Sequence, residues 1–260
     1  MNLTATPNSR LRCPANRRLW GVVGFLVVLL LIVVSTSQAA DSKAFVAYAE
    51  SVLISSREQY QHEPTNSEAA WQFGRACFDR AEFATNATER ATLAVQGIEA
   101  MRKLVAREPK LAAGHYYLAM NLGQFARTKL LGVLSIVDEM EVEFKTAREQ
   151  DEHFDHAGPD RNLAQLYFQA PGWPASIGSH IKARKHFERA LELAPDYPGN
   201  HLNLLEAYLH WKDEKGIQRE VKAIKALWPE ARTNFTGKAW ASTWADWEAR
   251  RAELVRRAGK

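Results

Sequence analysis

Apolar residues recur along this chain at offsets of three and four, the spacing that places side chains on one face of a helix. The pattern is clearest before two prolines, at five, eight and twelve positions upstream: Ala190, Phe187 and Ala183 before Pro195, and Ile224, Val221 and Ile217 before Pro229. The two prolines are 34 residues apart. Each is expected to end its helix, because proline has no N–H group and clashes with the preceding turn.

A second pattern precedes each of these helices. A leucine, a neighbouring apolar residue and an aromatic recur 41 residues apart: Leu163, Ala164 and Tyr167, then Leu204, Leu205 and Tyr208. These stand at the leucine, small-residue and aromatic positions of W-x-x-L-G-x-x-Y, the front half of a tetratricopeptide repeat, whose period is 34 residues. Two helical hairpins are therefore predicted here.

Two earlier hairpins follow from weaker matches. The first takes Phe73, Gly74 and Cys77 in its front helix and Gly97, Met101 and Leu104 in its back helix, and the second takes Leu118, Ala119 and Leu122 with Met140, Phe144 and Ala147. Flanking helices are predicted over residues 43–61 and 239–257. No segment alternates with a period of two, which argues against a sheet. We expect an all-α α-solenoid of about four degenerate hairpins over residues 67–230, after an N-terminal helix in 40–66 and before a capping helix in 231–260.

The third hairpin carries an insertion between its helices. Residues 170–178 contain Pro171-Gly172-Trp173-Pro174, which cannot continue a helix. The insertion is either a rigid wall of a ligand groove, with Trp173 as a stacking face, or a plug between hairpins. The other candidate groove residues are chosen by their positions on front helices: His115, Tyr116, Tyr117 and Arg161.

Residues 1–39 have the layout of a secretory signal. Four arginines precede an apolar run over residues 19–34, and small residues lead to Ala39 and Ala40, where cleavage is expected. The alternative is an uncleaved inner-membrane anchor, since a run of 16 residues is close to the roughly 20 that span a bilayer. A twin-arginine export signal is a third interpretation. All three predict an exported, periplasmic protein.

Charge and cysteine content narrow the function. The leader holds 4 of the 34 basic residues and no acid, so 30 basic residues face 30 acidic ones in the rest of the chain. The net positive charge of the full sequence therefore comes from the leader alone, and nucleic-acid binding is not expected. Cys13 lies in the leader, which leaves Cys77 without a partner for an internal disulfide.

Several longer stretches resemble known tetratricopeptide families. Residues 69–78 (AAWQFGRACF) and 114–123 (GHYYLAMNLG) resemble the eukaryotic regulators of microtubule dynamics and the bacterial TRAP transporter T-component. Residues 163–201, including the insertion and the DYPGNH segment, are most similar to the T-component. The resemblance implies a periplasmic helical-repeat protein, self-associating in some members, with a groove or pore that serves a transporter's binding protein. The lipid-bearing cysteine typical of that family is absent.

Two further features admit two interpretations each. His153 and His156 lie among carboxylates and suit a divalent metal, or form a polar turn in which Asp155 or Asp160 caps the next helix. The second feature is a stripe of tryptophans at spacings of four and three, Trp240, Trp244 and Trp247, which suits a partner-docking surface or, as we favour, a cap on the last hairpin.

No catalytic motif is present: the sequence has no Gly-rich phosphate loop, G-x-S-x-G or H-E-x-x-H. The expected function is non-catalytic binding of a protein partner or small ligand in a groove or pore, without a cofactor or metal. The role is accessory to a TRAP-type transporter or that of a general envelope scaffold, and a metal-dependent enzyme is the remaining alternative. Membrane contact is expected only if the leader stays attached, and a homo-oligomer remains open.

Overall fold

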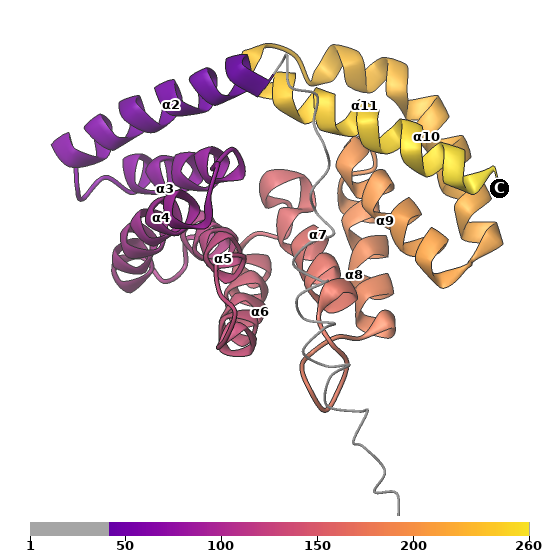
Figure 1. The fold of residues 1–260 in the computed structure, drawn as a ribbon, viewed down its shortest axis with the longest axis horizontal. Helices are drawn as coiled ribbons and strands as arrows, with labels where there is room; N and C mark the ends of the chain where they lie inside the picture. Colours follow the sequence, from indigo (N-terminus) through magenta and orange to yellow (C-terminus); the bar gives the residue numbers. More distant parts are fainter. Residues whose placement is uncertain (1–41, 260) are drawn as a thin grey trace, which may run out of the picture. The chain divides into compact units, whose positions relative to one another are not determined.

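The computed structural model describes residues 42–259 (Figure 1), and this part of the chain contains ten helices and no strand. The helices are α2 (Ser42–His62), α3 (Ser67–Glu82), α4 (Ala87–Arg107), α5 (Ala112–Ala126), α6 (Val133–Gln150), α7 (Phe154–Gln169), α8 (His180–Leu193), α9 (Pro198–Trp211), α10 (Glu214–Asn234) and α11 (Lys238–Ala258). The all-α prediction is confirmed. The predicted leader, with Cys13, lies outside the described residues.

Four antiparallel hairpins form the array: α3 with α4, α5 with α6, α7 with α8, and α9 with α10. The front helices α3, α5, α7 and α9 also contact their successors in the same series, and this makes them one continuous inner layer. At the two ends, α2 packs on α3, and α11 packs on α9 and α10. Helices α2 and α11 also contact each other, so the first and last described helices meet.

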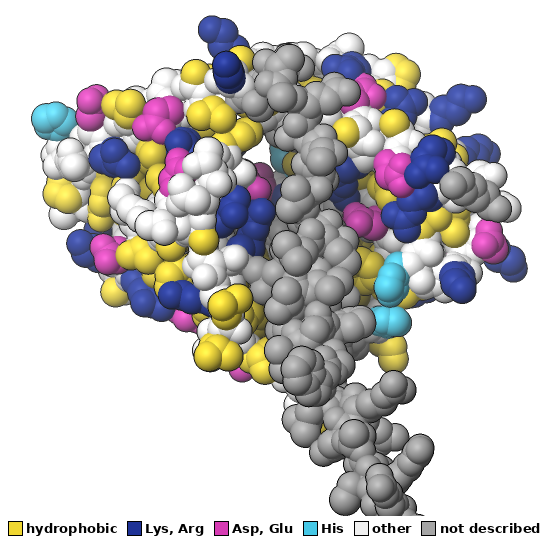
Figure 2. All heavy atoms as spheres, viewed as in Figure 1, with side chains coloured by type: hydrophobic (Ala, Val, Ile, Leu, Met, Phe, Trp, Pro, Cys, Tyr) yellow, Lys and Arg dark blue, Asp and Glu magenta, His cyan; other side chains and the backbone are white. Residues whose placement is uncertain are grey.

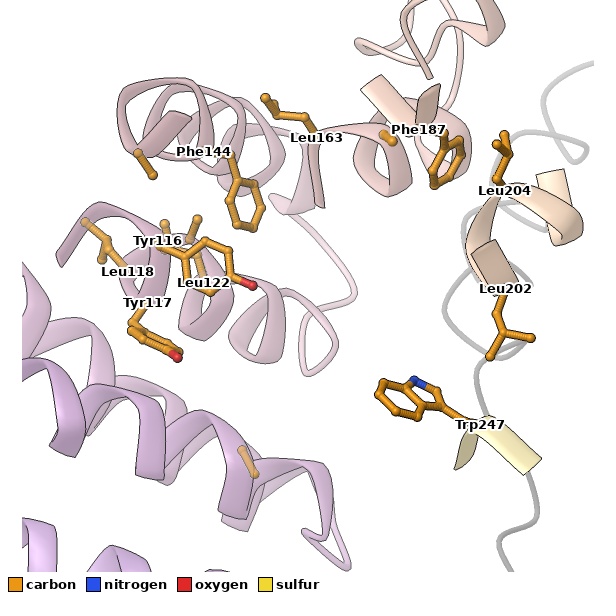
Figure 3. Close-up of a cluster of buried hydrophobic side chains, with 14 of the residues drawn as sticks. Tyr116, Tyr117, Leu118, Leu122, Phe144, Leu163, Phe187, Leu202, Leu204 and Trp247 are labelled. Carbon is orange, nitrogen blue, oxygen red and sulfur yellow. The ribbon is translucent and has the colours of Figure 1, made fainter. Parts of the chain in front are cut away.

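The predicted apolar offsets form the core (Figure 3). In α8, for example, Ala183, Phe187 and Ala190 are all buried. The core cluster extends from Leu53 to Leu254, and these residues contact one another along the whole array. Residues 40–260 therefore contain the full core of the described helices.

Helix starts are fixed by side chains that accept a backbone N–H group of the first turn. These caps are Asn66 for α3, Asn86 for α4, Ser179 for α8 and Asp213 for α10. Close approach between helices also needs one glycine in particular. A Cβ atom on Gly158 would lie 2.7 Å from the Tyr116 hydroxyl oxygen, so only glycine lets α7 pack on α5 here.

One expected helix end is wrong. Pro195 follows the end of α8, but Pro229 lies inside α10, which continues beyond residue 230 to Asn234. Pro229 is exposed, so the carbonyl group that it leaves unbonded can be hydrated. The buried Trp228 and Ala231 flank it and extend the packing face of α10, which offsets the lost hydrogen bond.

The tryptophan stripe of α11 faces the array. Trp244 and Trp247 are buried, and the Trp244 Nε1 group donates a hydrogen bond to the Phe235 carbonyl oxygen at 2.6 Å. The Trp247 ring packs edge-on against Tyr197, with centroids 5.2 Å apart. In the structure this stripe closes the exposed end of the last hairpin.

A histidine–carboxylate pair joins the two helices of three successive hairpins. The paired atoms are 2.5–2.9 Å apart in His115–Glu143, His186–Asp160 and His201–Glu220. Each front-helix member lies three residues before the leucine of its repeat motif, and each back-helix member directly precedes Phe144, Phe187 or Val221. The pairs thus occupy equivalent positions, with the acid and the histidine exchanged in the middle hairpin.

The outer pairs have a second contact in common. The Nε2 atoms of His115 and His201 lie 3.0 and 2.8 Å from the carbonyl oxygens of Pro109 and Pro195, six residues earlier. The hydrogen bond to Glu143, together with the Pro109 contact, raises the pKa of His115 despite its burial. Each pair therefore ties the start of a front helix to its back helix.

We predict that His201→Ala lowers the free energy of unfolding by roughly 2–4 kcal/mol, because Glu220 is only 1% exposed and loses its partner on α9. The exchanged double variant His201→Glu/Glu220→His copies the order of the middle hairpin and should recover part of this loss. Urea unfolding followed by circular dichroism measures both. A double variant no more stable than His201→Ala would show that the pair is not an interchangeable unit.

Candidate functional site

The inner layer carries charged and aromatic side chains that interact electrostatically between helices of the array. We define the inner face by its polar members, which come from α3, α5, α7, α11 and the residues at the start of α9: Arg75, Asp79, Glu82, Tyr117, Asp155, Arg161, Tyr197, Asp246 and Arg250. In Figure 2 acidic and basic side chains lie together near the middle of the view.

Asp79 and Arg75 form the α3 side of this face. The Arg75 Nε and Asp79 Oδ2 atoms are 3.5 Å apart, and the two side chains are 47% and 45% exposed. Burial nevertheless raises the pKa of Asp79 to about 6, with the negative charge of Asp155 adding to the effect and Arg75 opposing it. Atoms packed around Asp79 therefore favour its neutral form, although nearly half of each side chain remains accessible to water.

Charges on α11 face the same space. Burial also raises the pKa of Asp246, and the carboxylate of Glu82 on α3 adds to the rise. Arg250 donates to the Asn203 Oδ1 atom at 2.7 Å and to the Glu206 carboxylate at 3.0 Å, which fixes α11 on α9. The inner face is thus bounded by α3 on one side and α11 on the other.

Arg161 is the central donor of the face. Its guanidinium group donates to the Asp155 carboxylate at 2.7 Å and to the His156 carbonyl oxygen at 2.9 Å. Its carbon atom Cζ also lies 4.8 Å from the centre of the Tyr197 ring. The Tyr116 hydroxyl donates to the same Asp155 oxygen at 2.5 Å, so α5, α7 and the start of α9 meet at one ion pair, in which the Arg161 side chain is 11% and the Asp155 side chain 30% exposed.

The first turn of α7 is left-handed. Asp155, His156 and Ala157 have φ values of 50°, 53° and 60°, a conformation that costs about 1–2 kcal/mol for each non-glycine residue. Arg161 and the Asn200 amide, which donates to the His156 carbonyl oxygen at 3.3 Å, hold this turn. Strained segments held in this way are concentrated at ligand sites.

The expected helix caps are wrong at this turn. Asp155 is inside the left-handed segment, where its carboxylate is already bonded to Arg161 and Tyr116. Asp160 is fully buried and bonds to Arg148 and His186. Neither carboxylate caps α7, because both form ion pairs with side chains.

Aromatic rings line the face between the charges. The ring of Tyr117 stacks on Trp71, with centroids 5.7 Å apart, and burial raises the pKa of its hydroxyl. The ring of His156 stacks on Tyr197 at 4.6 Å, and burial lowers the pKa of this histidine. Flat, poorly hydrated rings beside charges of both signs can hold amide groups and charged side chains alike.

The five predicted site residues do not all meet. Tyr116, Tyr117 and Arg161 lie together at the inner face. His115 is turned away into its pair with Glu143, and Trp173 is 89% exposed at the tip of the loop between α7 and α8. Of the nine members of the face, the sequence reasoning proposed only Tyr117 and Arg161 as groove residues. Four of those it missed carry a usable signal, an acid and an arginine one turn apart on the same helix: Arg75, Asp79, Asp246 and Arg250.

His153 and His156, the histidines of the metal interpretation, are not arranged as ligands of one metal ion. His153 is exposed, whereas His156 is turned onto Tyr197. Within residues 42–259 no three histidine, cysteine or acidic side chains gather as metal ligands would. Likewise, none of the helices in this range is long and apolar enough to cross a membrane.

Comparison with known proteins agrees with the fold. A family described as "Regulator of microtubule dynamics protein 1-3" matches residues 35–133, which contain α2 to α5. The chain resembles the crystal structure of a thermophilic tetratricopeptide-repeat (TPR) protein of Thermus thermophilus, with a TM-score of 0.55 and 16% identity over 89% of this chain and 97% of that one. Among curated proteins none matches. This chain is therefore a tetratricopeptide-like helical-repeat protein.

We predict that Arg161→Met lowers the free energy of unfolding by about 3 kcal/mol or more, because it leaves Asp155 without its cation and the left-handed turn without its main donor. Arg102→Met is the matched control, since its ion pair with Glu139 is exposed and should matter little. Equal losses in the two variants, measured by urea unfolding, would contradict this role of Arg161.

We predict that Asp79→Asn makes the protein more stable than the wild type at pH 7.5 and that the difference shrinks toward pH 4.5. The pKa of Asp79 rises from 3.8 to about 6 on folding, so Asp79 binds a proton more readily in the folded state, and its own contribution to wild-type stability falls as the pH rises through these values. Unfolding of both proteins across this range measures the difference. A gap that widens on acidification would contradict the raised pKa of Asp79.

Proposed function

We propose that this chain is an exported, non-catalytic binding protein that holds a segment of a partner protein against its inner face. Tetratricopeptide-like arrays bind other proteins through such faces, and this general role agrees with the fold. The polar and aromatic residues of the inner layer are the proposed contact surface.

The observation that carries the proposal is the mixed charge of the inner face. Asp79 pairs with Arg75 one turn away on α3, Asp246 pairs with Arg250 one turn away on α11, and aromatic rings such as Tyr117 belong to the same face. Nucleic acid would be met by a surface of basic residues. A polypeptide presents both charge signs and many amide groups, so its chemistry fits this face better.

Export and a transporter role are the narrower parts of the proposal. The basic, apolar and small-residue segments of residues 1–39 support export to the periplasm, with an inner-membrane anchor as the alternative. The resemblance of residues 163–201 to the TRAP transporter T-component supports a substrate-binding protein as the partner. Fractionation of cells that express the full chain tests the location. Recovery of the protein in the cytosol alone would contradict the proposed export.

We predict that charge reversal at the inner face abolishes partner capture. The wild-type chain and the variant Arg75→Glu/Asp79→Lys are each immobilised and incubated with envelope extract of the source organism. Because the Arg75–Asp79 pair belongs to the proposed contact surface, a partner band retained by the wild type should be lost by the variant.

The matched control is Arg102→Glu/Glu139→Arg, which reverses an exposed pair between α4 and α6 outside the inner face. It should capture the partner as the wild type does. Equal capture by both reversed variants would contradict binding of a protein at the inner face. A small molecule that raises the melting temperature of the wild type but not of Arg75→Glu/Asp79→Lys would favour a small ligand instead.

A further inference from the structure

The loops that join front to back helices fall on one edge of the array, because successive hairpins are antiparallel in the same sense. Two neighbouring loops are long: residues 127–132 between α5 and α6, and residues 170–179 between α7 and α8. Both lie at the lower end of their hairpins in Figure 1. We define the loop edge as these two loops with the first turn of α8.

The loop edge carries the most exposed large apolar side chains of the described chain. Leu130, Leu131, Trp173 and Ile181 are 90%, 88%, 89% and 84% exposed. The other exposed large apolar residues within residues 42–259 reach at most 58%, and the remaining tryptophans in this range are buried or half-buried. The exposure is therefore concentrated on one edge.

The longer loop is ordered by its own backbone. The N–H groups of Gly178 and Ser179 donate to the carbonyl oxygens of Pro171 at 2.8 Å and Tyr167 at 2.9 Å, closing the loop at its base. A Cβ atom on Gly178 would overlap the Ala170 carbonyl oxygen, so this closure needs glycine. Trp173 is presented to solvent at the end of a closed loop.

The same edge is basic. Neither residues 127–137 nor residues 170–187 contain an acid, although acidic and basic residues balance over the chain after the leader. Lys129 and Lys185 lie close in sequence to these apolar residues, and so does Lys182, whose Nζ atom is 4.0 Å from the Glu141 carboxylate. A hollow of about 470 Å³ opens beside the first turn of α8; it is lined by Arg184, which pairs with Asp213 at 3.0 Å, and by His180, Ile181, His210 and Trp211.

We propose that the loop edge docks on an anionic phospholipid bilayer. Exposed tryptophan and leucine side chains partition into the interface between headgroups and acyl chains, while nearby lysines attract anionic headgroups. This contact is made by the loop edge, which contains no member of the inner face and does not include the leader, so the inner face stays available to a partner while the protein lies on a membrane.

The test is sedimentation of residues 40–260 with vesicles of phosphatidylcholine that contain about 30 per cent phosphatidylglycerol. The wild type should bind these vesicles, bind phosphatidylcholine alone at least about tenfold less, and lose binding at high salt. Trp173→Ala and Leu130→Asp/Leu131→Asp should each weaken binding by about tenfold or more, because each removes inserted apolar surface. Trp173 fluorescence, compared between wild type and Trp173→Ala, should shift to shorter wavelength on binding.

The matched control is Ile54→Asp, which changes a 46% exposed side chain on α2, away from the loop edge, and should leave vesicle binding unchanged. Circular dichroism confirms that each variant is folded. Absence of vesicle binding by the wild type would overturn the proposal, as would binding that the loop variants do not weaken. Self-association or protein capture that Leu130→Asp/Leu131→Asp abolishes, without vesicle binding, would assign the edge to a protein contact instead.

Discussion

The guanidinium group of Arg161 is the interaction on which the inner layer depends. It is nearly buried, and it bonds to the carboxylate of Asp155 and to the carbonyl oxygen of His156 while lying over the ring of Tyr197. Through these contacts one side chain joins α5, α7 and the start of α9. A cation that is this well hydrogen-bonded can stay charged in a poorly hydrated site, and burial without those partners would be costly.

The same contacts explain the strained turn at the start of α7. Three successive left-handed residues would not persist in an isolated helix, and the bonds from Arg161 and Asn200 to the His156 carbonyl oxygen stabilise them. The turn places the Asp155 carboxylate against the Tyr116 hydroxyl of α5 and the His156 ring on Tyr197. Local strain is thus coupled to the arrangement of charges on the inner face.

The helices could be predicted from sequence because their signals are local. The apolar offsets before Pro195, for example, need only residues of the same helix to act. Pro229 failed as a helix end because burial of Trp228 and Ala231, a tertiary effect, outweighs the proline. The inner face was only partly predictable, since Asp155 and Arg161 meet through a left-handed turn that no periodicity indicates and Asp246 reaches the face from the last helix.

The central claim is that a partner binds the inner face, and hydrogen exchange of the bound complex tests it most directly. With the partner captured from envelope extract, the account predicts new protection of backbone amides in α3, in residues 154–161 of α7 and in α11. The back helices α4 and α8 should exchange as they do in the free protein. Protection confined to α4, α8 or the outer side of α10 would contradict the account, because it would place the partner on the opposite face of the array.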